Sequence, residues 1–143
     1  IIQENNIEFT YGLLFEDIAT TYKIFKNSER VSIINGTNYL YRKHTNSIVN
    51  SNLSKKSVND YTKATKCVYD DLIATENPLI EGYYLHRLYE NYRRIVRRNL
   101  QSEFPTEIKY LKKEMKTHFS FRNIKTFSIK QKIIFLSTVF VFN

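Results

Sequence analysis

The first 54 residues alternate between short apolar runs and one amphipathic stretch, a pattern typical of an α/β unit. Residues 9–15 form a short apolar run that predicts a strand, and apolar side chains at three- and four-residue spacing predict a helix over residues 16–27. Residues 30–34 and 37–42 are rich in β-prone side chains, and Asn35-Gly36 stands between them. Asn-Gly between two such runs is a strong hairpin signal, so we expect two antiparallel strands there.

From residue 55 onward, apolar positions recur at helical spacing. We expect a polar loop over residues 43–57, followed by a first helix with Ser57 as its N-cap. Three later helix starts are marked by a proline or a capping residue, at Asn77-Pro78, Pro105-Thr106 and Ser128. The pattern therefore predicts two regions: an α/β unit over residues 1–54 and a bundle of about four helices over residues 55–143.

The net charge of +8 belongs entirely to the second half of the chain. Residues 1–76 carry nine basic and nine acidic side chains, whereas residues 77–143 carry thirteen basic and five acidic ones. This asymmetry indicates either a solvated basic face or a surface for an anionic membrane or a polyanionic partner. The single cysteine, Cys67, excludes an internal disulfide framework and a cysteine-rich zinc site.

Two stretches of the helical region combine basic and apolar side chains. Residues 83–98 interleave aromatic residues with arginine, as nucleic-acid binders do, but the aromatic residues fall on the apolar stripe, which favours core packing over nucleic acid. Residues 128–143 begin with lysines and end in apolar residues, and they are too short to span a bilayer. This last helix is either an interfacial membrane anchor or a helix whose apolar end packs on the helices before it.

The first candidate for chemistry is the pair Glu16-Asp17, which stands where the predicted strand of residues 9–15 passes into a helix. A carboxylate at such a junction has a rigid support, lies near the free amides of the helix end and reaches a cleft at the strand ends. It could then act as a general base. The alternative is an acidic pair that only stabilises the N-terminus of the helix.

The second candidate is the end of the predicted strand pair, where Tyr-Leu-Tyr-Arg-Lys-His-Thr-Asn-Ser-Ile occupies residues 39–48. Four polar side chains cluster on the exit of this strand: Arg42, His44, Asn46 and Ser47. A guanidinium binds phosphate oxygens with two parallel hydrogen bonds, and imidazole and hydroxyl groups add directional donors. Together they would suit a diphosphate leaving group, although such side chains are also common on surface loops.

Two stretches of the chain closely resemble family 2 glycosyltransferases of the GT-A fold: Gly-Leu-Leu-Phe-Glu-Asp with its following helix, and the residues 39–48. In particular they are similar to the bacterial enzymes of capsule, teichoic acid and surface polysaccharide assembly. The resemblance covers residues 8–48. It implies a partial GT-A, Rossmann-like half and the transfer of a sugar, with inversion, from a nucleotide-sugar donor to a glycan or lipid-linked acceptor.

The same resemblance implies a role for each matching residue. Asp17 matches the aspartate that takes the proton from the acceptor hydroxyl, with Glu16 beside it at the acceptor side. The positions that hold the nucleotide diphosphate match Arg42 and Ser47, with His44 and Asn46 between them.

One departure from the family is large. Its first half carries an Asp-x-Asp motif that holds a divalent metal, Mg²⁺ or Mn²⁺, at the diphosphate, and no Asp-x-Asp occurs in these 143 residues. The first residue is also not Met. We therefore expect the C-terminal part of a glycosyltransferase, cytoplasmic or peripheral on the inner face of the plasma membrane, that is inactive without its donor-binding half. The alternative is a non-catalytic basic helical module that docks on a membrane or a partner.

Overall fold

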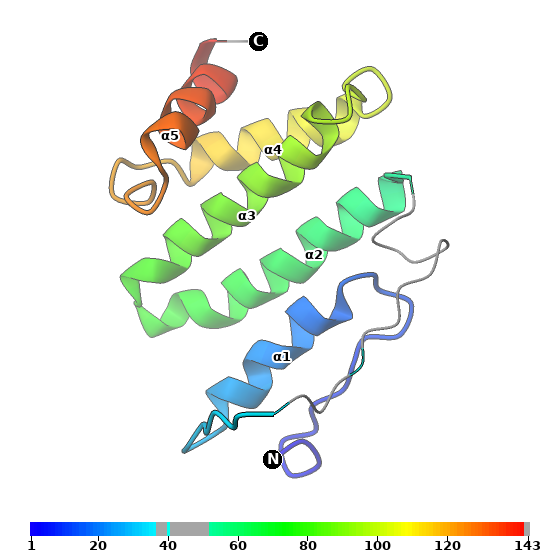
Figure 1. Ribbon diagram of the computed structural model, residues 1–143, viewed down its shortest axis with the longest axis vertical. Helices are drawn as coiled ribbons and strands as arrows, with labels where there is room; N and C mark the ends of the chain where they lie inside the picture. Colours follow the sequence, from blue (N-terminus) through cyan, green and yellow to red (C-terminus); the bar gives the residue numbers. More distant parts are fainter. Residues whose placement is uncertain (37–39, 41–51, 142–143) are drawn as a thin grey trace.

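The computed structural model describes residues 1–36, 40 and 52–141, and within them the chain forms five α-helices (Figure 1). They are α1 (Glu16–Lys26), α2 (Lys55–Leu72), α3 (Pro78–Val96), α4 (Pro105–Thr117) and α5 (Ile129–Leu136). A short 3₁₀ helix, Ile73–Thr75, follows α2, and a π-helical turn, Ser137–Val141, extends α5.

The predicted starts of α3, α4 and α5 are confirmed. The side chain of Asn77 accepts a hydrogen bond from the backbone N–H of Leu79 at 3.0 Å, and proline occupies the first turn of both α3 and α4. At α5, Ser128 and Gln131 form a capping box in which each side chain accepts from the other's backbone N–H. Each device satisfies or removes a backbone donor that the helix itself leaves free.

The predicted start of α2 is wrong by one turn. Its N-cap is Ser54, which accepts a hydrogen bond from the backbone N–H of Ser57 at 3.1 Å, and Ser57 is the third residue of the same capping box. Both serines fit the requirement for a cap, so the sequence pattern alone did not separate them. The predicted loop therefore ends before Lys55, and most of it lies outside the described residues.

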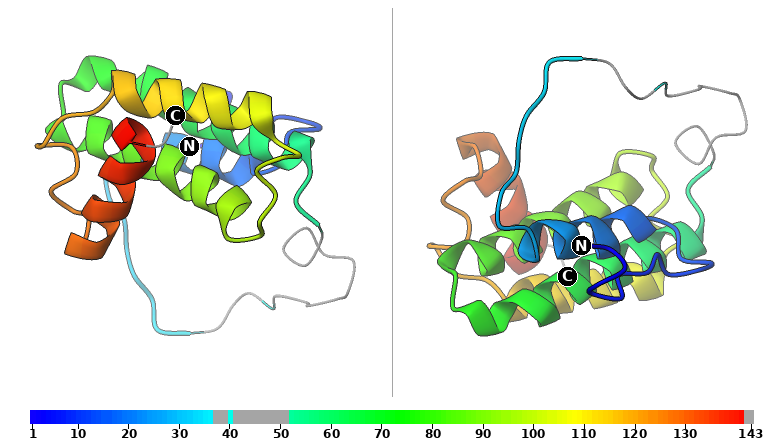
Figure 2. Two further views of the ribbon diagram at one scale, coloured as in Figure 1. Left: turned by 90° about the horizontal axis from the view of Figure 1, so that it is seen from above. Right: turned by 90° about the horizontal axis from the view of Figure 1, so that it is seen from below.

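Helices α2, α3 and α4 pack against one another, and α1 packs on α2. Figure 1 shows α1, α2 and α3 side by side, with α5 at the far end of the bundle from α1. Figure 2 shows α5 set across α3 and α4, and its π-helical end contacts α4.

The core is built around aromatic side chains of α3 and the C-terminal segments. Tyr89 stacks on Phe127 at 5.4 Å and meets Phe135 edge-on at 5.5 Å, and Phe127 and Phe135 are 5.6 Å apart. Such ring pairs add to the stabilisation that their buried apolar area provides. The spacing of apolar residues predicts a stripe on α3 that consists of Ile80, Tyr84, Leu88, Tyr92 and Ile95. Tyr84, Leu88 and Ile95 are buried, as this prediction requires, and Ile80 and Tyr92 are half-buried.

One buried amide joins α3 to α2. Asn91 is fully buried, and its Nδ2 donates to the carbonyl oxygen of Val58 and to Oγ1 of Thr62, both at 2.9 Å. Its Oδ1 accepts a hydrogen bond from Arg94 at 3.2 Å. The amide is thus paired on both sides, which a polar group in an apolar interior requires.

The α/β fold class, a partial GT-A Rossmann-like half, is wrong for the described part of the chain. Residues 9–15 and 30–36 contain turns and irregular backbone but no strand, and residues 37–39, 41 and 42 of the second predicted strand lie outside the described residues. A strand needs neighbours to satisfy its backbone groups and cover its side chains, and an isolated hairpin is marginal. Val31, Ile33 and Ile34 accordingly remain exposed. The helix predicted over residues 16–27 is confirmed as α1.

Helix α5 divides its apolar residues between the core and the surface. Phe135 is buried, as is Val139 in the π-helical turn that follows, whereas Ile129 and Ile133 are exposed. Among the described residues, no helix combines the length and the apolar character that crossing a membrane requires.

Candidate functional site at the start of helix α1

The segment that carries Glu16 and Asp17 is fixed to α2 by polar contacts. The backbone N–H of Leu14 donates to Oδ2 of Asp60 at 3.0 Å, and Nζ of Lys56 donates to the carbonyl oxygen of Gly12 at 2.7 Å. Lys56 also forms an ion pair with Asp60 one turn later on α2. The loop before α1 is therefore held at two backbone groups by one Lys–Asp pair.

Asp60 is the buried member of that pair. Burial alone would raise the pKa of its carboxyl group, but the hydrogen bonds from Lys56 and from the Leu14 N–H outweigh burial and hold the pKa below its usual value. Asp60 is therefore a carboxylate at neutral pH and accepts both bonds in its charged form, in which they are strongest.

The ring of Phe15 provides an apolar attachment at the same place. Phe15 is the N-cap residue of α1 and has left-handed backbone angles, with φ at 65°. Its ring meets Tyr61 edge-on at 5.2 Å, and the guanidinium of Arg94 lies over it at 5.1 Å. A left-handed phenylalanine is costly, and these ring contacts provide compensation.

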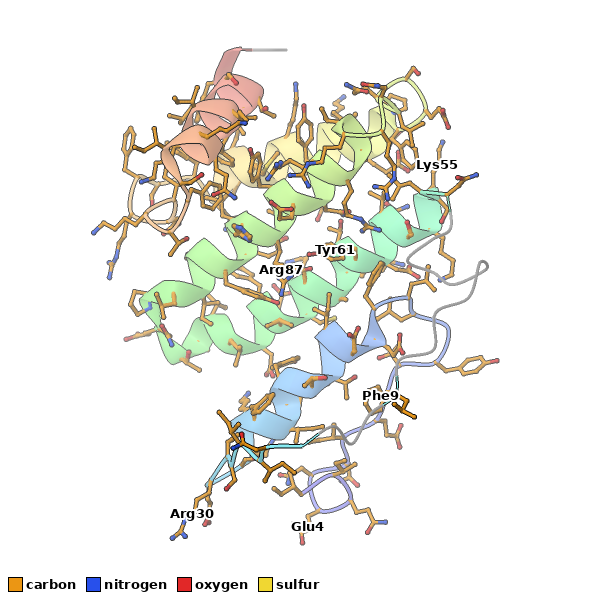
Figure 3. The ribbon with its side chains drawn as sticks, viewed as in Figure 1. Glu4, Phe9, Arg30, Lys55, Tyr61 and Arg87 are labelled. Carbon is orange, nitrogen blue, oxygen red and sulfur yellow. The ribbon has the colours of Figure 1, made fainter. Side chains whose placement is uncertain are left out.

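Arg94 is enclosed by aromatic rings instead of acidic groups. Its guanidinium also lies 5.2 Å from the centre of the Tyr61 ring, and burial lowers its pKa from the ordinary value. Nearby, Arg87 donates to the hydroxyl of Tyr61 at 3.3 Å, and Figure 3 shows these two labelled side chains between α2 and α3. The start of α1 thus rests on a surface of tyrosine and arginine.

The far end of α1 is also tied to α2. Nζ of Lys26 donates to Oδ1 of Asp71 at 3.0 Å, and this bond, against the effect of burial, holds the pKa of Asp71 below its usual value. The neighbouring aspartates of α2 thus have different partners, because Asp71 holds α1 while Asp70 pairs with Lys66. With both ends attached, α1 has a fixed position on the bundle.

The two candidate carboxylates stand in the first turn of α1. Asp17 is exposed and Glu16 is half-buried. Within residues 1–36 and 52–141, neither carboxylate forms a hydrogen bond or ion pair with another side chain. Both lie at the positive end of the helix. The N-cap residue, Phe15, provides no side-chain hydrogen bond to the first N–H groups there. Asp17 is thus a rigidly supported carboxylate that is open to solvent.

The remaining predicted site residues fall outside the described part of the chain. These are the residues expected to hold the diphosphate, Arg42, His44, Asn46 and Ser47. Their role in holding the nucleotide diphosphate therefore stays a prediction.

The described residues do not fit a divalent metal. No group of three or more His, Cys, Asp or Glu side chains among them is arranged to hold one. The metal expected at the diphosphate stays a prediction, and no chemical step below depends on it.

Sequence reasoning missed the residues that support the site. Lys56, Asp60 and Arg94 lie thirty residues or more beyond the end of α1. The Lys–Asp spacing of four residues was a visible sign of an ion pair on α2, but it did not indicate that the pair would hold another segment.

A second polar cluster joins α3 to α4, where the sequence analysis recognised no site. Nδ1 of His118 lies 3.1 Å from Oε2 of Glu81, and the hydroxyl of Tyr69 donates to Oε1 of the same glutamate at 2.8 Å. Burial, followed by the bond to Glu81, raises the pKa of Tyr69 to about 12. Tyr84 donates to Glu114 at 3.1 Å, so each acid has a neutral tyrosine partner. The arrangement is that of a structural network between helices.

Comparison with models of protein families, with curated proteins and with solved structures yields no significant match. The glycosyltransferase resemblance accordingly rests on the motifs of residues 8–48.

Proposed function

We propose that this chain supplies the acceptor-side base of an inverting glycosyltransferase, with Asp17 as the base. One observation carries the proposal: the loop of residues 12–15, directly before α1, is attached to α2 and α3. The Asp17 carboxylate in the first turn of α1 is therefore exposed on a fixed support. A general base must be within hydrogen-bond reach of the proton it takes, so a fixed position matters as much as the chemical group. Here the support is a helical bundle, in place of the strand expected from the sequence.

In the proposed reaction, Asp17 takes the proton from a hydroxyl group of a glycan or lipid-linked acceptor. The acceptor oxygen forms a bond to the anomeric carbon of the sugar while the bond to the nucleotide diphosphate breaks on the opposite face. Glu16, half-buried beside Asp17, lies at the acceptor side. Arg42 and Ser47, with His44 and Asn46 between them, would receive the negative charge of the departing diphosphate.

The donor must be bound by further residues in this proposal. These 143 residues contain no Asp-x-Asp, and their described part forms no sheet. We infer that the nucleotide-sugar is held by a donor-binding half outside these residues, without which the chain does not transfer sugar.

The test is made on the full-length protein with a nucleotide-sugar donor. Asp17→Asn should lower turnover by about 100-fold or more and leave donor affinity nearly unchanged, since only proton removal is lost. Arg42→Ala should weaken binding of the nucleoside diphosphate by about 1.5–3 kcal/mol in calorimetry, as expected for a charged hydrogen bond. The matched control is Asp70→Asn, an exposed aspartate on α2 outside the site. Turnover of Asp17→Asn within a few-fold of the Asp70→Asn control would remove Asp17 from the mechanism.

A further inference from the structure

Helix α5 presents an apolar face to solvent that is separate from the face it buries. Phe135, on the buried side of α5, and Val139, in the π-helical turn that follows, are almost fully enclosed. Ile129 and Ile133, one turn apart on the other side, are 78% and 63% exposed. Packing on the preceding helices therefore accounts for only part of the apolar character of this segment.

One lysine stands on each side of these isoleucines. At about 100° per residue, Lys132 and Lys130 lie about 60° and about 100° from Ile129 in opposite directions around the helix. Lys130 is exposed and Lys132 is half-buried. Lysine side chains in such places can lay their apolar stems along the surface and extend their ammonium groups away from it.

After residue 114 the sequence carries basic side chains and no acidic one. Glu114 is the last acidic residue of the sequence, and the loop before α5 adds the exposed Arg122 and Lys125. On the neighbouring helix α4, Lys109, Lys113 and Lys116 are exposed as well.

Exposed aromatic rings adjoin the same segment. Phe121 in the loop and Phe140 in the π-helical turn are 75% and 51% exposed, and their rings lie 5.3 and 5.0 Å from that of Phe119. Apolar rings at a polar boundary are typical of segments that lie in a membrane interface.

We propose that α5 and the loop before it dock on the surface of an anionic lipid bilayer. Ile129 and Ile133 enter the boundary of the acyl chains, and Lys130 and Lys132 bind lipid phosphates on either side. The match is one of charge and shape, because an apolar stripe with a lysine on each side fits a plane that is apolar beneath and anionic above. The docking surface shares no residue with Asp17 or residues 39–48, so its failure would leave the proposed function untouched.

A tryptophan reporter tests the orientation directly. The chain contains no tryptophan, so Ile133→Trp introduces a single emitter on the proposed face. With vesicles containing about one-third phosphatidylglycerol, its emission should shift to the blue and be quenched by brominated acyl chains. The matched control is Phe25→Trp, because Phe25 is similarly exposed, at 56%, but stands on α1, which lies at the far end of the bundle from α5. Its emission should not change.

Co-sedimentation with the same vesicles measures the two contributions separately. The double variant Lys130→Gln/Lys132→Gln should weaken binding by about fivefold for each lysine. The control is Lys55→Gln/Lys63→Gln, two exposed lysines on α2, the first of which Figure 3 shows on the other side of the bundle from α5. Ile129→Ser/Ile133→Ser should weaken binding by about tenfold or more, whereas Phe25→Ser on α1 should not. Binding should also fall as salt rises from about 0.1 M to about 0.5 M.

Several results would overturn the proposal. One is a wild-type chain that does not bind anionic vesicles, in which case the surface faces water or a protein. Another is equal binding to vesicles of phosphatidylcholine alone, which would remove the role of the lysines. A third is an equal loss in the α5 variants and their controls. All substituted apolar residues are exposed, so the helices should remain, and circular dichroism of each variant checks that they do.

Discussion

Replacement of Asp60 by asparagine tests whether the Lys56–Asp60 pair holds the start of α1. Asparagine keeps the size of the side chain and can still accept from the N–H of Leu14, but it loses the ion pair with Lys56. A hydrogen bond to a charged group is worth about 1.5–3 kcal/mol, and the exposure of Lys56 to solvent reduces that value. We therefore expect the free energy of unfolding to fall by about 1–2 kcal/mol at pH 7.

The pH dependence of this loss has a definite sign. The pKa of Asp60 is lower in the folded chain than the value of about 4 in the unfolded chain, so its contribution to stability is present above about pH 4. The contribution is lost as the pH falls through the folded-state pKa, because the carboxyl group then becomes protonated. Asparagine does not titrate, so the stability difference between the two proteins should shrink below about pH 4.

The assay is urea unfolding of both proteins from pH 7 to pH 3, followed by circular dichroism. Asp70→Asn is a matched control, because Lys66–Asp70 is another pair of the same spacing on α2 but both members are exposed. It should cost no more than about 0.5 kcal/mol. A loss for Asp60→Asn that equals the loss for Asp70→Asn, or that stays constant down to pH 3, would refute the reasoning.

Two further changes test the core and the backbone, each by urea unfolding. Phe135→Ala removes a buried ring that contacts Tyr89, so it should lower the free energy of unfolding by about 3–5 kcal/mol. The control Ile134→Ala, at a partly exposed site on the same helix, should cost less than about 1 kcal/mol. Equal losses would mean that the ring is not packed as described. Glu76→Gly should raise the free energy of unfolding by about 0.5–1 kcal/mol, because Glu76 has φ at 54°, in the left-handed region that glycine adopts more easily. Asn99→Gly, at the same φ, should have a smaller effect, because asparagine tolerates left-handed backbone angles. A lower free energy of unfolding for Glu76→Gly would contradict the argument from backbone strain.

The helices could be predicted from the sequence because their signals are local. Asn77-Pro78 and Ser128 satisfy or remove backbone donors within a few residues, and each marks a helix start in the structure. The α3 stripe was likewise read from spacing alone. The pattern missed Asn91, which is polar and yet buried, since its partners Val58 and Thr62 lie on another helix.

The strands could not be established in the same way. The apolar side chains of Val31, Ile33 and Ile34 have high β-propensity, but propensity becomes a strand only when another strand pairs with it. The described residues contain no such partner, and these side chains remain exposed.

The candidate site was predicted only in part. Glu16 and Asp17 could be identified from the sequence as an acidic pair at a helix start, and the structure places them in the first turn of α1. Their support could not be identified, because Asp60 on α2 and Arg94 on α3 contact the segment only once the helices are packed. Contacts between distant parts of the chain follow from how the helices pack, which periodicity does not encode.

The buried amide of Asn91 also sets the register of α2 and α3. A slip of one helical turn, about 5.4 Å, would move it away from the Val58 carbonyl and leave a polar group unpaired in an apolar interior. Helices α2 and α3 are thereby restricted to a single alignment. Because Asn91 also accepts from Arg94, whose guanidinium lies over Phe15, the same alignment determines where the chain holds Asp17. A substitution at Asn91, far from the candidate base in the sequence, would therefore change the place of that base without touching it.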